Sequence, residues 1–262
     1  MRQTLAGKNV VITGASKGLG RALAVAFARA GTARLALIAR TEDLLREVKQ
    51  LLVKEAPKLK VLTIGADLSN EADIERAVAL TLHEFGGRVD ALINNASVLG
   101  PAPMPYLLDY PTDEFKNVLA TNVIAPFILI KKFLPGILEA NGSIINVTSD
   151  AGVVGYPGWG AYGISKFGLE GMSQTWAAEL EDTGMRLNWV DPGAMNTEMH
   201  RLAEPEEDPS EWADPADVVD VFLYLASDDS AGVHGKRFQA QEPAWGHPDI
   251  AADEVIHAEH RS

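Results

Sequence analysis

Short runs of apolar, β-branched residues alternate along this chain with longer segments in which apolar residues recur every three or four positions. The short runs have the length of buried strands, and the longer segments have the period of amphipathic helices. The pattern predicts strands at 9–13, 35–39, 61–65, 91–94, 143–148, 186–190 and 236–239, and helices at 19–30, 42–56, 71–85, 115–138, 162–180 and 216–226.

A repeated strand–helix series calls for a parallel sheet with helices on both faces. We therefore predict an α/β fold: a doubly wound parallel sheet of the Rossmann type, in three αβα layers. No linker divides the chain, so we expect residues 1–262 to form a single domain. Two segments fall outside the series. An acidic, proline-rich stretch at 204–217 is predicted to be a loop, and a polar tail occupies 246–262.

Composition narrows the class of protein. Apolar residues make up 47% of the 262 residues, which is enough for a substantial core. The net charge of −13 disfavours a nucleic acid as partner, and the lack of cysteine excludes disulfides and thiolate metal sites. No run approaches the roughly 20 apolar residues of a membrane helix, and the N-terminus lacks a signal-peptide pattern. We therefore expect a cytoplasmic protein without a membrane partner.

The first predicted strand leads directly into a glycine-rich turn, and a helix follows. Glycines suit such a turn because they adopt unusual backbone angles and let a phosphate approach the chain. The helix N-terminus then offers free N–H groups to a pyrophosphate. An ordinary tight turn would use the same residues. The candidate cofactor-binding residues here are Gly14, Ser16, Lys17, Gly18, Leu19 and Gly20.

The end of the second predicted strand bears on the choice of nicotinamide cofactor. An acidic residue there would bond the ribose 2′-hydroxyl of NAD, but this chain has Arg40. A guanidinium can pair with the 2′-phosphate of NADP, and Lys17 offers a second positive charge. We therefore expect NADP in preference to NAD. The alternatives are that both cations are simply solvated, or that nearby Glu42 and Asp43 serve NAD.

Three residues form a candidate catalytic group. Ser149 follows the fifth predicted strand, and Tyr162 and Lys166 lie four apart on one helix face. Carbonyl reduction needs a proton donor, and a tyrosine with a pKa of about 10 must be perturbed to act as a base near neutrality. A lysine cation about 4 Å away would stabilise the phenolate by an amount of the right size. Each residue alone has a common structural role, so their combination carries the hypothesis.

Taken with the glycine turn, these residues resemble the short-chain dehydrogenases/reductases, in the branch of roughly 250 residues. The resemblance extends from about residue 7 to residue 239, with the motifs in family order. It implies that Asn122 belongs to the catalytic set and passes a proton outward, with Tyr162 as general acid/base, Lys166 on the nicotinamide ribose and Ser149 on the substrate oxygen. The resemblance adds cofactor contacts at Asp67, Leu68, Asn94, Ala96, Tyr162, Lys166, Pro192, Gly193 and Thr197.

The resemblance also implies a homodimer or homotetramer, with contacts through the helices around 115–138 and 162–180. The chain departs from the family pattern at two places. Ser97 replaces the glycine that usually follows Asn-Asn-Ala. The C-terminal strand lacks the family's usual Asp-Gly-Gly ending and reads Gln239-Ala240-Gln241-Glu242-Pro243 instead. The second departure puts pocket closure and tetramer geometry in question.

The expected substrate is a small carbonyl or alcohol. A lid at 196–213 follows the sixth predicted strand and is acidic, which disfavours polyanionic substrates and points to a neutral or apolar one. An uninvolved, solvated loop is the alternative. Asp150 beside Ser149 would contact a polar substrate group or face solvent. Apolar candidates for the pocket lining are Tyr156, Trp159, Met195, Met199 and Trp212.

Two other functions are compatible with this fold. A non-catalytic nicotinamide sensor or scaffold is disfavoured because it would have no need for all of Ser149, Tyr162 and Lys166. An epimerase or dehydratase is disfavoured by the short chain and small lid. His247, His257 and His260 in the tail are more consistent with a polar terminus than with a metal site, so we predict no metal.

Overall fold

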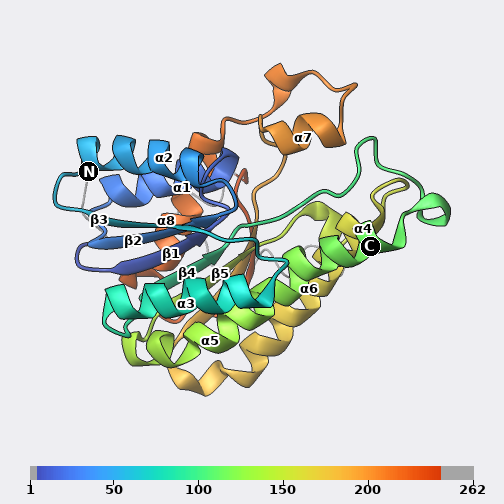
Figure 1. Ribbon diagram of the computed structural model, residues 1–262. Coiled ribbons are helices and arrows are strands. Elements are labelled where there is room, and N and C mark those ends of the chain that lie inside the picture. The colour runs from blue at the N-terminus through green and yellow to red at the C-terminus, as the bar shows by residue number, and fades with distance from the viewer. Residues whose placement is uncertain (1–4, 243–262) are drawn as a thin grey trace.

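The computed structural model describes residues 5–242, and its centre is a seven-stranded parallel sheet (Figure 1). The strand order is β3-β2-β1-β4-β5-β6-β7, and all seven predicted strands are present with ends within one residue of the prediction. Their bounds are β1 Asn9–Thr13, β2 Arg34–Ala39, β3 Lys60–Gly65, β4 Ala91–Asn94, β5 Ser143–Val147, β6 Arg186–Asp191 and β7 Arg237–Gln239. The doubly wound, Rossmann-type fold is confirmed.

Helices cover both faces of the sheet. Helices α1, α2 and α8 lie on one face, and α3, α5 and α6 on the other (Figure 1). Their bounds, with those of two helices near the carboxyl edge, are α1 Gly18–Arg29, α2 Glu42–Glu55, α3 Glu71–Phe85, α4 Thr112–Leu119, α5 Ala125–Ala140, α6 Gly160–Glu179, α7 Glu198–Ala203 and α8 Asp220–Ala226.

The core has two halves because the strands alternate their side chains between the faces. On β1, Val10 and Ile12 pack with Phe27 and Phe222 from α1 and α8, whereas Val11 packs with Phe133 from α5. All six side chains are fully buried. Each such burial contributes about 1.5–3 kcal/mol. Both faces of the sheet are therefore fixed, and with them the positions of the strand ends.

The strand order reverses direction between β1 and β4. In a doubly wound sheet, a crevice opens at the carboxyl ends of the strands at such a point, and ligands bind there. The segments that follow β1, β4, β5 and β6 all start from this edge. These segments contain the glycine turn, Ser149 and Pro192, and Asn94 ends β4, so the fold brings together motifs that are far apart in sequence.

The predicted helix at 115–138 was wrong in one respect. It is divided into α4 and α5 by a π-helical turn at Ala120–Ile124, and Asn122 lies in that turn. Pro126 follows immediately, in the first turn of α5. Proline has no N–H and its ring crowds the carbonyl four residues earlier, which here belongs to Asn122. A wider turn accommodates both effects.

The segment after β6 contains a short helix just before the predicted loop at 204–217. Helix α7 starts after Thr197, whose hydroxyl accepts a hydrogen bond from the His200 amide. A 3-10 turn at Pro215–Val218 precedes α8, so the helix predicted at 216–226 begins late. Within residues 5–242, no helix is long and apolar enough to cross a membrane.

Candidate active site

The glycine turn between β1 and α1 leaves no room for side chains. Gly14 and Gly18 have φ angles of +66° and +48°, a region that disfavours other residues. A Cβ atom at Gly14 would lie 2.8 Å from the Ala96 Cα, and one at Gly20 would overlap the Gly14 carbonyl. The first N–H groups of α1 face outward from this turn without helical partners. The turn therefore fits a pyrophosphate group of a dinucleotide.

The loop after β4 holds the glycine turn in place. The side-chain amide of Asn95 donates to the carbonyl oxygens of Thr13 at 2.8 Å and Gly14 at 3.3 Å. The Thr13 hydroxyl oxygen in turn accepts from the amides of Asn95 and Ala96, both at 3.0 Å. Thr13 and Asn95 were absent from the predicted site. Their position at the ends of the strands on either side of the crossover could have identified them.

Two buried polar atoms beside this turn have no hydrogen-bond partner among the described residues: Oδ1 of Asn94 and Oγ of Ser97. The amide of Asn94 is otherwise held, because its Nδ2 donates to Asn146 at 2.8 Å. An unsatisfied buried polar atom costs about 1–3 kcal/mol. A polar ligand bound where β1 and β4 end would supply these missing hydrogen bonds. The two atoms therefore fit a bound nicotinamide dinucleotide.

The two predicted cofactor cations are in different situations. Arg40 is exposed and makes no hydrogen bond or ion pair within the described part of the chain. Lys17 is bonded at 2.7 Å to Glu198, the first residue of α7. Asp67 is exposed and accepts two hydrogen bonds from Ser69. Only Arg40 therefore offers an unpaired positive charge at the end of β2.

Tyr162 and Lys166 lie on the buried face of α6, as their spacing predicted. Only 9% of Tyr162 and 3% of Lys166 is exposed. The Lys166 ammonium donates to the Val147 carbonyl at 2.8 Å and lies 5.4 Å from the centroid of the Tyr162 ring. Ser149 starts the 3-10 turn Asp150–Gly152 directly after β5, and its hydroxyl is within hydrogen-bonding reach of the Tyr162 phenol. The three predicted residues therefore meet.

Burial dominates the acid–base properties of this group. Desolvation raises the pKa of Tyr162, and the negative charges of Asp191 and Asp150 raise it further, whereas the Ser149 hydrogen bond lowers it. Desolvation also lowers the pKa of Lys166 to about 8, against the pull of Asp191 and Glu170. From the sequence we weighed the attraction of the phenolate to Lys166 and to an oxidised nicotinamide, but not the desolvation that dominates the pKa of Tyr162 in this structure.

Asn122 joins two parts of the site from its place in the π turn. Its Oδ1 accepts from the Val98 amide and its Nδ2 donates to the Val98 carbonyl, both at 2.9 Å. The same Nδ2 lies 3.0 Å from the Ser165 hydroxyl on α6. Asn122 thus fixes the loop after β4 against the helix that carries Tyr162 and Lys166.

A buried ionic network, which sequence reasoning missed, lies beneath the catalytic group. Arg237 on β7 donates to Glu170 and Asp191, both at 3.0 Å, and to the Ser149 carbonyl at 3.3 Å. Glu170 also accepts from the Thr148 hydroxyl at 2.7 Å. Both carboxylates are less than 10% exposed. One signal was present in the sequence, since Glu170 lies four residues after Lys166 on the same helix.

The remaining predicted cofactor residues follow β6. Gly193 has a φ of +70°, and its amide donates to Asp191 at 2.9 Å. The departure from the family pattern has a structural role here, because Gln241 donates to the carbonyls of Pro192 and Ala194, both at 2.9 Å. Thr197 would lie 3.2 Å from a Cβ at Gly18. The segment after β6 thus closes against the glycine turn.

A small apolar cluster, separate from the two halves of the core, includes Tyr162. Of the five predicted pocket residues, Trp159 and Met199 belong to it, and Tyr156 contacts it through Trp159 at 6.0 Å between ring centroids. Trp212 instead makes an edge-to-face contact with His200 and donates to Glu207, and Met195 packs against the α1 side of the core. The cluster comprises Leu99, Met104, Ala151, Trp159, Tyr162, Met199 and Ala203.

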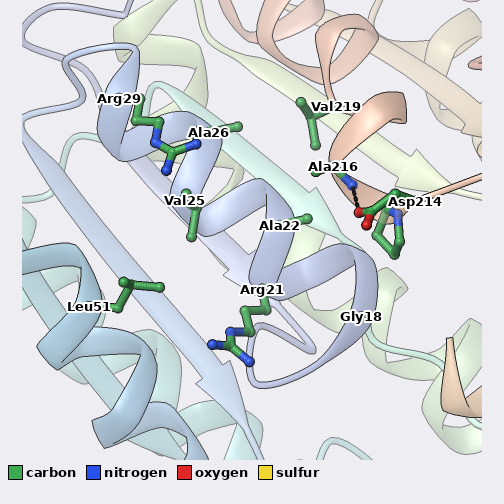
Figure 2. A pocket seen from close by; sticks show the side chains of 11 residues that line it. Gly18, Arg21, Ala22, Val25, Ala26, Arg29, Leu51, Asp214, Ala216 and Val219 are labelled. Carbon is green, nitrogen blue, oxygen red and sulfur yellow. Dashed lines mark hydrogen bonds between the residues drawn. The ribbon is translucent and has the colours of Figure 1, made fainter. Parts of the chain in front are cut away.

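A separate surface pocket of about 340 Å³ lies against the outer side of α1 and contains no member of the catalytic group. Figure 2 shows Arg21 and Arg29 on α1 on one side of it and Asp214 and Ala216 on the other. The described residues hold no group of three or more side chains that could bind a metal ion. The tail at 246–262, with its three histidines, lies outside the described residues.

Comparisons with known proteins identify close relatives. A family model described as "short chain dehydrogenase" matches residues 8–208. The uncharacterized oxidoreductase YciK of Escherichia coli K12 is 34% identical, over 88% of this chain and 91% of that protein. A putative short chain dehydrogenase from Pseudomonas syringae superposes with a TM-score of 0.87 at 38% identity, over 92% of this chain and 97% of that one. A Shigella flexneri putative short chain dehydrogenase complexed with NADP has a TM-score of 0.86 at 32% identity, over 92% and 100%.

Proposed function

As this chain belongs to the short-chain dehydrogenase family, we propose that it is an oxidoreductase that transfers hydride between NADP(H) and a small carbonyl or alcohol. One observation carries the proposal. Ser149, Tyr162 and Lys166 converge at the same sheet edge as the glycine turn, so a proton donor and a dinucleotide site adjoin. A nicotinamide sensor would not need a buried lysine beside a buried tyrosine.

NADP is the proposed cofactor, and the chain offers a residue for each part of it. The glycine turn would hold the pyrophosphate, and Arg40, exposed and unpaired among the described residues, would pair with the 2′-phosphate. Asp67 and Leu68 would contact the adenine, and Asn94, Ala96, Pro192, Gly193 and Thr197 would surround the nicotinamide half. The NADP complex of the Shigella flexneri relative supports this choice.

The bound cofactor supplies the hydride and, once oxidised, a positive charge. In carbonyl reduction, Tyr162 donates its proton to the substrate oxygen while Ser149 orients that oxygen. A raised pKa keeps the phenol protonated at neutral pH, which suits a proton donor. The positive charge of Lys166 offsets part of the cost of burying the phenolate that results. Asn122 holds the loop after β4, next to the path by which a proton would return to Tyr162.

The apolar cluster around Tyr162 supports a neutral or apolar substrate. An anionic substrate would be repelled by the acidic lid and by Asp150, whose carboxylate lies 2.9 Å from the Ser149 hydroxyl oxygen.

We also propose a homodimer or homotetramer. Four large apolar side chains are 41–51% exposed: Ile124 in the π turn, Phe127 on α5, and Ile164 and Phe167 on α6. Such exposure is unusual for large apolar residues gathered on neighbouring helical segments. Light scattering should give a mass of two or four chains, and Phe127→Glu with Phe167→Glu should shift it to one. A wild-type mass of a single chain would refute the assembly.

An NADPH oxidation assay with a panel of ketones and aldehydes tests the proposed function. Wild-type protein should consume NADPH with at least one carbonyl, and Tyr162→Phe should not. Failure of the wild type on the whole panel, in the presence of measurable NADPH binding, would favour a sensor.

A further inference from the structure

Asp150 is an exposed carboxylate in direct contact with the candidate catalytic serine. Its Oδ1 accepts hydrogen bonds from the Ser149 hydroxyl at 2.9 Å and from the Ala151 amide at 2.8 Å. Its Oδ2 accepts from the Tyr156 hydroxyl at 3.0 Å. Nothing in the proposed transfer of hydride and proton requires a carboxylate here, and the negative charge even opposes ionisation of Tyr162. The position of Asp150 therefore calls for a separate role.

The single proton of the Ser149 hydroxyl decides what the serine can do. A serine hydroxyl donates one hydrogen bond and accepts two, whereas an ionised carboxylate only accepts. The Ser149 oxygen already accepts from the Ala151 amide at 3.2 Å. With its proton directed at Asp150, it retains one lone pair, which can face the Tyr162 phenol. In this arrangement Ser149 has no proton to offer a carbonyl oxygen, so Tyr162 alone would bind that oxygen.

A substrate can release the serine proton if it gives Asp150 another donor. In an α-hydroxy carbonyl compound, the hydroxyl and carbonyl oxygens lie on adjacent carbons, at a spacing close to one hydrogen-bond length. The Ser149 and Asp150 oxygens are separated by a similar distance, 2.9 Å. The substrate hydroxyl can then donate to Asp150 while the Ser149 hydroxyl turns to donate to the carbonyl. The number of hydrogen bonds rises, and no donor is left without an acceptor.

We propose that Asp150 is a specificity-determining residue that selects substrates with a hydroxyl group on the carbon next to the reacting carbonyl. This inference rests on the proposed function. In the reduction, the C=O π bond would break, its carbon would gain a hydride that bound NADPH supplies, and its oxygen would gain the proton of Tyr162. The products would be a vicinal diol, NADP⁺ and a Tyr162 phenolate, which regains its proton from water. The remainder of the substrate contacts the apolar cluster that includes Leu99, Met104 and Trp159.

A neutral hydroxyl suits this site better than a charged donor. The apolar cluster touches Ala151, the residue next to Asp150, as well as Tyr162. An ammonium group bound there would lose hydration on that side, which costs more than the desolvation of a hydroxyl. Tyr156 already shares the carboxylate charge through its own hydrogen bond.

Acetoin and butanone provide a matched test, since they share a four-carbon skeleton and differ by the α-hydroxyl. With NADPH, wild-type kcat/KM should be about 10- to 100-fold higher for acetoin, as expected for a hydrogen bond to a charged group. Asp150→Ala and Asp150→Asn should lose this preference while their kcat/KM for butanone stays equal or rises. Asp217→Asn removes an exposed charge on the segment before α8 and should retain the preference.

Three outcomes separate the hypotheses. Equal wild-type efficiency on both ketones, or a preference that survives in Asp150→Ala, overturns the role of Asp150 but leaves a Tyr162-dependent reductase. A stronger response to the corresponding α-amino ketone than to acetoin overturns the assignment of a neutral hydroxyl. If the wild type reduces no carbonyl in a Tyr162-dependent way, the proposed function itself is overturned.

Discussion

The ammonium nitrogen of Lys166 lies 5.4 Å from the centroid of the Tyr162 ring, and both side chains are buried. Burial disfavours the charged form of each group, so it raises the pKa of the phenol and lowers that of the ammonium. Each group therefore depends on the other, because a charged lysine is what makes a buried phenolate tolerable.

Tyr162→Phe should reduce kcat by about 10²–10⁴-fold, because it removes the only proposed proton donor and leaves the ring in place. NADPH binding, measured by cofactor fluorescence, should remain within about twofold of wild type, since the glycine turn and Arg40 are untouched. Tyr106→Phe, at a tyrosine that is 68% exposed, serves as the control and should keep full activity. Substantial turnover by Tyr162→Phe would contradict the assignment.

Lys166 should impose a characteristic pH dependence on stability. Its pKa is about 8 in the folded protein against an ordinary 10.5, so between these values the unfolded chain binds the extra proton and the folded chain does not. Stability therefore rises with pH across this window, by about 3 kcal/mol from this group alone.

Urea unfolding of wild type and Lys166→Met between pH 7 and 10.5 measures this effect. The variant should be the more stable protein at pH 7, and its advantage should shrink as the pH rises. Lys58→Met, at an exposed position, should run parallel to wild type throughout. A constant difference between wild type and Lys166→Met would show that Lys166 has an ordinary pKa.

Arg40→Asp should exchange the cofactor preference. The substitution removes the partner of the 2′-phosphate and supplies an acceptor for a 2′-hydroxyl, so KM for NADPH should rise about 10- to 100-fold and that for NADH should fall. Lys49→Asp makes the same change of charge on α2 and should leave both values close to wild type. Wild-type protein that already prefers NADH would refute the role of Arg40.

Arg237→Met should destabilise the protein by about 3–5 kcal/mol, because it leaves the carboxylates of Asp191 and Glu170 buried without a counter-ion.

Restoring neutrality provides the control for Arg237→Met. Adding Asp191→Asn and Glu170→Gln should recover most of the lost free energy of unfolding, as measured in urea. If the triple variant is no more stable than Arg237→Met, packing rather than charge explains the loss.

Much of this architecture was predictable because its signals are local. Seven short apolar runs gave seven strands, and Tyr162 and Lys166 were placed together by their spacing on one helix. The glycine turn was identified because residues consecutive in sequence make it. The π turn at Asn122 was missed because the apolar period of the helix continues through it, and only Pro126 indicates the break.

Contacts between distant residues were not predictable in the same way. Arg237 is 46 residues from Asp191 and 67 from Glu170, and a charged residue in a strand gives no indication of its partner. The burial of Tyr162 was also not predictable, because it depends on the packing of the whole edge. The ion pair between Lys17 and Glu198 could not be predicted either, because it depends on the position of α7, a helix of six residues with little sequence signal.

The place of β7 at the end of the described chain has a consequence for biosynthesis. A ribosome has already delivered the glycine turn, Ser149, Tyr162 and Lys166 before it reaches Arg237. Until β7 pairs with β6, Asp191 and Glu170 have no counter-ion, and the floor of the site is open to water. The nascent chain therefore carries its reactive residues for some time without a finished site around them, and the docking of β7 completes that site.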